Sequence, residues 1–116
     1  MIYGIGLDLV ELGRLKIIIE EQPRFPQRIL TTEELRIYEH FSKRRQLEFL
    51  AGRFAGKEAF SKAYGTGIGA VSFQDIEILN HKNGQPYLAQ SPFSGKNFVT
   101  ITHTEHAAMA QVILEN

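Results

Sequence analysis

The chain has 116 residues, 43% of them hydrophobic, which is enough for one domain with a buried core, and we expect residues 1–116 to form that domain. Its 13 basic and 13 acidic side chains cancel, so the net charge does not indicate nucleic acid or an anionic membrane as a partner. The absence of cysteine excludes disulfides, thiolate metal sites and a cysteine nucleophile, so any metal must bind oxygen or imidazole.

The sequence shows no pattern for membrane insertion or export. No apolar run approaches the roughly 20 residues that span a bilayer, and the first residues lack the basic-then-apolar order of a secretory signal. We therefore expect a cytoplasmic protein. All seven arginines lie between Arg14 and Arg53, so an anionic partner should bind the N-terminal half of the chain.

The first predicted elements are a strand and a helix. Residues 2–10 are apolar and partly alternating, and glycines at 4 and 6 indicate a strand whose backbone is closely approached. Apolar positions with helical spacing predict a helix over 11–21. Asp8 lies near the end of the strand, where an aspartate more often caps the next helix than serves a site.

Two further helices are predicted after a loop. Thr31 and Glu34 have the spacing of a capping box, which predicts a short helix over 32–40. A stripe of apolar residues predicts the longest helix over 43–64, with Ser42 able to cap its start and Gly65 able to end it in the left-handed conformation.

The C-terminal half changes from helical to alternating periodicity. Asn83-Gly84 is a strong hairpin signal between a strand near 76–78 and a return strand that starts at Tyr87. Two more strands are predicted, one around 99–101 and one over 107–114. Helices grouped early and strands grouped late predict an α+β fold with an antiparallel sheet packed against the long helix.

Charged side chains continue the apolar stripe of the long helix. Phe54, Glu58 and Lys62 stand four residues apart, which places a carboxylate and an ammonium together where apolar residues are expected. On an ordinary helix this spacing is more often a weak surface ion pair. If the strand end brings Asp8 beside Glu58, however, the two carboxylates form an oxygen-only site that suits Mg²⁺ and a diphosphate.

Cations and glycines follow one another on and after the same helix. The cations are Arg45, Arg53, Lys57 and Lys62. The glycine-rich turn over 65–69 has backbone amides that can approach phosphate, although it lacks the Walker ending and alternate glycines are more often a flexible connector. His103 precedes a turn at a strand end, where it can face a cleft, but a lone histidine is more often structural.

Four short motifs occur in an informative order along the chain. They are Ile5-Gly6-Leu7-Asp8, the helix segment 53–63, Gly65-Thr66-Gly67 and Ile101-Thr102-His103-Thr104. Together they resemble the holo-[acyl-carrier-protein] synthases, a family of bacterial phosphopantetheinyl transferases, from Met1 to about Glu115. The resemblance implies transfer of the 4′-phosphopantetheine group from coenzyme A to a serine of apo acyl carrier protein, with adenosine 3′,5′-bisphosphate as the other product, in support of fatty acid biosynthesis. It also implies a homotrimer with active sites at the subunit interfaces.

The resemblance implies roles for individual residues as well. Asp8 and Glu58 would bind Mg²⁺ with the diphosphate, Glu58 would help to deprotonate the serine, and Lys62 would neutralise or protonate the leaving phosphate. The nucleotide would be bound by Arg45, Phe49, Arg53, Lys62, Gly65, Thr66, Ile68, His103 and Thr104. The acidic carrier protein would be bound by Arg14, Arg24, Phe25 and Arg28.

Two other functions use fewer of these features. A non-catalytic module that binds coenzyme A or its carrier needs the nucleotide contacts alone, but intact Asp8, Glu58 and Lys62 favour an enzyme. A domain that binds nucleic acid is disfavoured by the zero net charge and by the lack of aromatic residues on a basic strand.

Three local features need the structure for their interpretation. The closing strand places Gln111 among apolar residues, which suits either a threefold axis or an internal strand. Gly56 stands where alanine is common in the family, and it should cost the helix about 1 kcal/mol relative to alanine. Residues 90–97 fit no regular element and are assigned no function.

Overall fold

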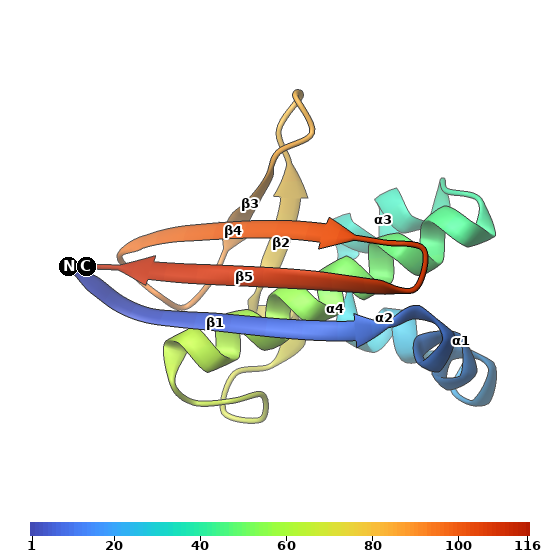
Figure 1. Ribbon diagram of the computed structural model, residues 1–116, viewed down its shortest axis with the longest axis horizontal. Coiled ribbons are helices and arrows are strands. Elements are labelled where there is room, and N and C mark those ends of the chain that lie inside the picture. The colour runs from blue at the N-terminus through green and yellow to red at the C-terminus, as the bar shows by residue number, and fades with distance from the viewer.

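The computed structural model describes residues 1–116 and has the predicted α+β architecture (Figure 1). The helices are α1 (Leu12–Glu21), α2 (Phe25–Ile29), α3 (Thr32–Glu39), α4 (Lys43–Tyr64) and the 3₁₀ helix η1 (Phe73–Asp75). The strands are β1 (Ile2–Glu11), β2 (Glu77–Asn80), β3 (Pro86–Gln90), β4 (Lys96–His103) and β5 (Ala107–Glu115). No helix is both long and apolar enough to cross a membrane.

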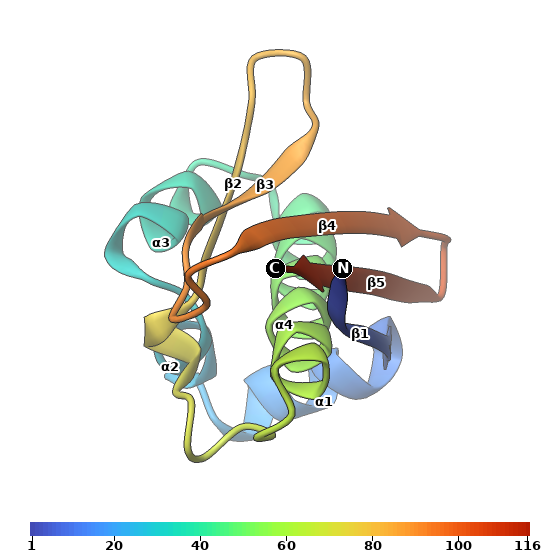
Figure 2. The same ribbon diagram turned by 90° about the vertical axis from the view of Figure 1, so that its left-hand side faces the viewer.

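Three strands form an antiparallel sheet in the order β1-β5-β4, and one face of this sheet packs on α4 (Figure 1). The predicted packing of an antiparallel sheet against the long helix is therefore confirmed. Alternation along β5 buries Ala108, Ala110, Val112 and Leu114 against the helix. Strands β2 and β3 form a separate hairpin, whose loop extends beyond the rest of the molecule (Figure 2).

Strand β1 runs unusually close to helix α4. A Cβ atom at Gly4 would collide with the carbonyl oxygen of Ala63, and one at Gly6 would collide with that of Ala59. The close approach predicted from the two glycines is confirmed. Because side chains alternate along a strand, Asp8 shares the face of Gly4 and Gly6 and is directed toward α4.

The predicted bounds of α4 are confirmed at both ends. Gly65 ends the helix in the left-handed conformation with φ 92°, which only glycine adopts without strain. Ser42 is the N-cap residue, but its side chain makes no capping hydrogen bond, so the predicted side-chain cap is absent. The capping box of Thr31 and Glu34 at the start of α3 is present as predicted.

Lys57 lies inside the protein rather than at a phosphate site. It is fully buried, and its ammonium donates to Glu34 Oε1 at 2.5 Å, to the Ile29 carbonyl at 2.7 Å and to the Phe73 carbonyl at 3.1 Å. Glu34 also accepts a hydrogen bond from the Ile78 backbone at 2.7 Å, so this ion pair joins α3, α4 and β2. The grouping of Lys57 with the phosphate-directed cations was wrong, because its ammonium is buried against Glu34 and two backbone carbonyl groups.

Two segments were predicted without regular structure, and the first differs from that expectation. Residues 25–29 form the single-turn helix α2, with Pro26 in its first turn. Residues 91–95 belong to no helix or strand, as predicted, whereas the two ends of the predicted range belong to β3 and β4. Ser91 donates to Asn97 Oδ1 at 2.6 Å, and the Phe93 ring lies 4.9 Å from the ring of Tyr3 in β1, so a hydrogen bond and an aromatic contact hold this loop.

Gly56 is explained by packing. A Cβ atom there would lie 2.6 Å from Ile78 Cδ1, so alanine would require the Ile78 side chain to move. The expected gain in helix propensity from alanine is therefore opposed by a clash with the hairpin.

Candidate active site

The three residues expected to be catalytic meet where β1 crosses α4, and we call this group the catalytic corner. Asp8 comes from the strand, while Glu58 and Lys62 come from successive turns of the helix. The Lys62 ammonium donates to Asp8 Oδ1 at 3.1 Å and to the Leu7 carbonyl at 2.9 Å. Asp8 and Glu58 both line a cleft of about 330 Å³, so the three residues expected to be catalytic are brought together within one chain.

The two carboxylates of this corner repel one another. Partial burial raises the pKa of Glu58 above its ordinary value, the negative charge of Asp8 raises it further, and Lys62 opposes both effects. A divalent cation between the carboxylates would relieve this repulsion. No cluster of three acidic or imidazole side chains exists, but Mg²⁺ is typically bound by one or two carboxylates with phosphate oxygens and water, so the pair fits this ion.

A second cleft, of about 200 Å³, gathers part of the expected nucleotide site. It is lined by Arg45, Phe49, Arg53 and His103, together with Asn80 and Pro86 from the hairpin. Arg53 is largely buried, and its guanidinium lies 4.1 Å from the Phe49 ring centroid. Its Nε atom donates to the Ile78 carbonyl at 3.2 Å, and a terminal nitrogen donates to Asn80 Oδ1 at 2.5 Å.

The second cleft is suited to an anion. Burial lowers the pKa of Arg53 to about 10, with Glu34 opposing the shift and the positive charge of Arg45 adding to it. Arg53 therefore stays positively charged at neutral pH beside a second arginine, and a phosphate would stabilise both. Asn80 and Pro86 were not predicted as site residues from the sequence. The one signal near them was the Asn83-Gly84 hairpin turn, which predicts a turn and not a binding role.

Four other expected nucleotide contacts, Lys62, Gly65, Thr66 and Ile68, lie away from this cleft at the C-terminal end of α4. Gly65, Thr66 and Ile68 follow the C-terminal end of α4 beside Lys62. Arg45 and Lys62 are 17 residues apart on one helix, which at about 1.5 Å per residue separates them by about 25 Å. One chain therefore does not bring the complete expected set together.

Thr104 lies in the turn between β4 and β5. Its hydroxyl oxygen accepts hydrogen bonds from the backbone N–H groups of His106 and Ala107, both at 3.1 Å. These contacts fix the turn directly after His103, so Thr104 supports the end of the second cleft from within the chain.

Two of the four expected carrier-binding residues, Arg14 and Phe25, lie next to the catalytic corner. Arg14 lines the same cleft as Asp8 and Glu58. The Phe25 ring packs edge-on against Phe54, another residue of this cleft, at 5.5 Å between ring centroids. Arg24 and Arg28 flank Phe25 in sequence, and Arg28 donates to Gln22 Oε1 at 3.1 Å.

Comparison with known proteins defines the class. Residues 4–113 match the 4′-phosphopantetheinyl transferase superfamily, and the chain belongs to it. Within that superfamily it is similar over its full length to holo-[acyl-carrier-protein] synthases, as the four motifs predicted. Those of Enterococcus faecalis and Streptococcus pyogenes are 62% and 53% identical over 116 residues, which span 99% and 98% of the two relatives.

Solved structures give the same result. The holo-(acyl-carrier-protein) synthase of Bacillus anthracis, in complex with CoA (3′,5′-ADP), superposes with a TM-score of 0.92 at 45% identity, covering 99% of this chain and 97% of that one. The holo-[acyl-carrier-protein] synthase of Neisseria meningitidis gives a TM-score of 0.91 at 38% identity, with both chains fully covered.

Proposed function

We propose that this chain transfers the 4′-phosphopantetheine group of coenzyme A to a serine of apo acyl carrier protein, in a Mg²⁺-dependent reaction catalysed by a homotrimer. The observation that carries the proposal is the corner of Asp8, Glu58 and Lys62, which lies beside Arg14 and Phe25. This places groups for charge neutralisation and proton transfer next to a basic surface for an acidic partner.

Each residue of the corner has a chemical task. The serine oxygen forms a bond to the phosphorus that carries the pantetheine, and the bond from that phosphorus to the adenosine bisphosphate breaks. Glu58 accepts the serine proton, directly or through water. Lys62 neutralises the leaving phosphate oxygen or gives it a proton. Asp8 and Glu58 would hold Mg²⁺, which supplies neutralisation of the diphosphate charge when bound.

The separation of the two clefts supports an active site shared between subunits. Lys62 and the turn after α4 lie at the C-terminal end of the helix, whereas Arg45 lies in its first turn and lines the second cleft with Arg53 and His103. A coenzyme A molecule that contacts both sets needs the second set from a neighbouring chain.

The outer face of the sheet supports the proposed trimer. On the face of β1 turned away from α4, Ile5, Leu7 and Leu9 are 58%, 51% and 56% exposed. Gln111 lies on this same face, directly opposite Leu7 in the strand pairing, rather than in the interior. Such an apolar face is typical of a surface that another subunit covers.

The reaction is tested by the mass of apo acyl carrier protein after incubation with the chain, coenzyme A and Mg²⁺. We expect a gain equal to one phosphopantetheine group, abolished by EDTA and by Glu58→Ala but retained by Lys82→Ala at the tip of the hairpin. A chain that binds coenzyme A yet gives no mass gain with several carriers would instead be the non-catalytic module.

The shared site is tested by mixing two impaired variants, Glu58→Ala and Arg45→Ala, and allowing their subunits to exchange. If each site takes Glu58 from one chain and Arg45 from another, random exchange of equal amounts leaves about one quarter of all sites intact, and activity returns. Light scattering should give three subunits. Absence of recovery in demonstrably mixed oligomers, or activity in a monomer, would contradict the shared site.

A further inference from the structure

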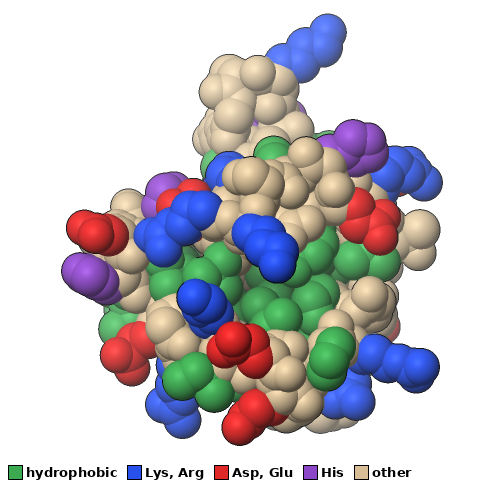
Figure 3. Space-filling view, turned by 90° about the vertical axis from the view of Figure 1, so that its right-hand side faces the viewer, with side chains coloured by type: hydrophobic (Ala, Val, Ile, Leu, Met, Phe, Trp, Pro, Cys, Tyr) green, Lys and Arg blue, Asp and Glu red, His purple; other side chains and the backbone are tan.

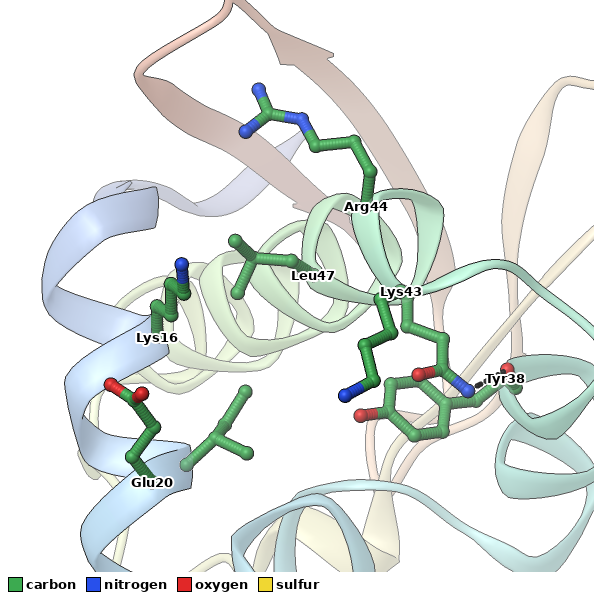
Figure 4. Close-up of a pocket in the computed structure, with 8 residues that line it drawn as sticks. Lys16, Glu20, Tyr38, Lys43, Arg44 and Leu47 are labelled. Atoms are coloured by element: carbon green, nitrogen blue, oxygen red, sulfur yellow. Dashed lines mark hydrogen bonds between the residues drawn. The ribbon is translucent and has the colours of Figure 1, made fainter.

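A third pocket lies outside both clefts, between α1, α3 and the first turns of α4 (Figure 4). Its volume of about 460 Å³ exceeds that of either cleft and falls within the range of about 300–1,000 Å³ typical of small-molecule sites. It shares no residue with the catalytic corner or with the second cleft. The roles proposed for the two clefts therefore do not explain this third pocket.

The pocket combines an apolar wall with a cationic rim. Ile19 from α1 and Leu47 from α4 form the wall, and the Tyr38 ring extends it. Lys16 and Lys43 reach the rim from opposite sides, so their aliphatic stems add to the apolar surface while their ammonium groups stay in water (Figure 4). On the corresponding face, Figure 3 shows hydrophobic side chains gathered together with lysine or arginine side chains over and beside them.

Two of the three cations of the rim have no ion-pair partner within the protein. Lys16 and Lys43 take part in none of the ion pairs of the molecule. Arg44 pairs with Glu48 at 3.4 Å and donates to the Glu105 carbonyl at 2.8 Å. Glu20 is the single acidic residue of the lining, so the two unpaired lysines leave the pocket positively charged.

The start of α4 makes this charge more unfavourable in the absence of a ligand. The N-terminus of a helix carries a partial positive charge, yet the first turn of α4 holds no acidic residue and includes Lys43, Arg44 and Arg45. An anion in the pocket would stabilise both the helix end and the side chains around it.

A hydroxyl donor completes the polar side of the pocket. In Figure 4 the Tyr38 hydroxyl and the Lys43 ammonium point toward one another, and the hydroxyl has no hydrogen-bond partner in the protein. Tyr38 is fixed by Gln46, whose side-chain amide donates to the Tyr38 carbonyl at 3.0 Å. Partial burial raises the pKa of Tyr38, so its hydroxyl keeps its proton and can donate to an anion at neutral pH.

We propose that this pocket binds a small amphiphilic anion, with a carboxylate or phosphate head held by Lys16, Lys43 and the Tyr38 hydroxyl, and a short hydrocarbon body resting on Ile19 and Leu47. The cations alone would suit any anion, but the apolar wall adds affinity only for one with a hydrocarbon portion. Inorganic phosphate should therefore bind much more weakly than an alkyl phosphate or an alkanoate.

Calorimetric titration of the full chain tests this proposal with three probes: octanoate, octyl phosphate and inorganic phosphate. We expect saturable binding of one molecule per chain for at least one of the octyl compounds, at least about tenfold tighter than inorganic phosphate. The double variant Lys16→Gln/Lys43→Gln should weaken that binding by about tenfold or more. Lys82→Gln, which removes a lysine from the remote hairpin tip, should leave it unchanged.

Two controls make the outcome decisive. Coenzyme A titrated into the double variant should bind as it does to the unaltered chain, which shows that the variant is folded and that the proposed transferase site is independent of this pocket. Backbone amide NMR signals from residues around Ile19 and Leu47 should shift on addition of the octyl compound. Failure of both octyl compounds to saturate, tightest binding by inorganic phosphate, or equal weakening by Lys82→Gln would overturn the proposal.

Discussion

Two parts of helix α4 hold opposite charges in position by different means. In its C-terminal half, Glu58 meets Asp8 because the glycines of β1 bring main chain against main chain. In the middle of the helix, Arg53 is fixed by hydrogen bonds from its side chain to the hairpin. One helix thus carries an acidic site set by backbone contact and a basic site set by side-chain bonds, and these should respond differently to substitution.

The largest effect is expected at Lys57, which lies between Arg53 and Glu58 along the helix. Lys57→Met leaves Glu34 buried without its counter-charge, so we expect a loss of about 3–5 kcal/mol in the free energy of unfolding, measured by urea denaturation. The double variant Lys57→Met/Glu34→Gln removes the stranded charge and should recover part of the loss. Equal stability of the two variants would mean that the charge of Glu34 is not the cause.

A somewhat smaller effect is expected where β1 meets α4. Gly6→Ala forces a methyl group against the Ala59 carbonyl and should cost about 1–3 kcal/mol of stability while displacing Asp8 from Glu58. Gly13→Ala is the matched control, because nothing lies within 4 Å of a Cβ atom there and helix α1 should gain up to about 1 kcal/mol. Urea denaturation compares the two, and a similar loss in both would contradict the close backbone contact.

In the second cleft, Arg53→Lys should weaken the binding of coenzyme A more than it slows the reaction of bound coenzyme A. Lysine keeps the charge but lacks the planar fork that donates to Ile78 and Asn80, so we expect affinity to fall about tenfold, which is about 1.4 kcal/mol. Calorimetry measures the change. Arg36→Lys, at an exposed pair with Glu33, should bind coenzyme A normally.

The smallest effect concerns the pH dependence of stability in EDTA. The pKa of Glu58 is raised in the folded state, so its stabilising contribution is fully present below the ordinary value of 4.5 and is lost as the pH rises through the folded value. Glu58→Gln avoids this loss. We expect its thermal midpoint to exceed that of the unaltered chain slightly at pH 7.

Thermal melts at pH 7 and pH 4 check this sign. The difference between Glu58→Gln and the unaltered chain should shrink at the lower pH, whereas Glu39→Gln, at the exposed end of α3, should change little at either pH. A difference that grows on acidification would show that the carboxylate of Glu58 is stabilising in the metal-free protein.

Local sequence patterns predicted the elements better than their contacts. Helix α4 was predictable because its apolar stripe, its length and Gly65 agree, and the capping box at Thr31 is a short-range pattern. Helix α2 was missed because it has a single turn, although Pro26 at its start is a known signal of a helix N-terminus.

The candidate site was predictable only in part for the same reason. The motif that contains Asp8 and the helix motif that contains Glu58 identified the catalytic corner, and the glycines explained how they meet. The partner of Lys57 is Glu34, which lies on another helix, and no local spacing connects the two. The distance between the two clefts likewise depends on the packing of α4 against the sheet and the hairpin, which periodicity does not encode.

The bare glycine backbone of β1 has a consequence for how the sequence can vary. With no side chains between Gly4, Gly6 and the carbonyls of α4, the spacing between strand and helix is set by covalent geometry and the contact of main-chain atoms. Substitutions elsewhere in the core can then accumulate without moving the two carboxylates apart. Many positions can therefore accept substitutions although Gly4 and Gly6 cannot. The spacing between Asp8 and Glu58 can then be inherited unchanged while the surrounding sequence diverges.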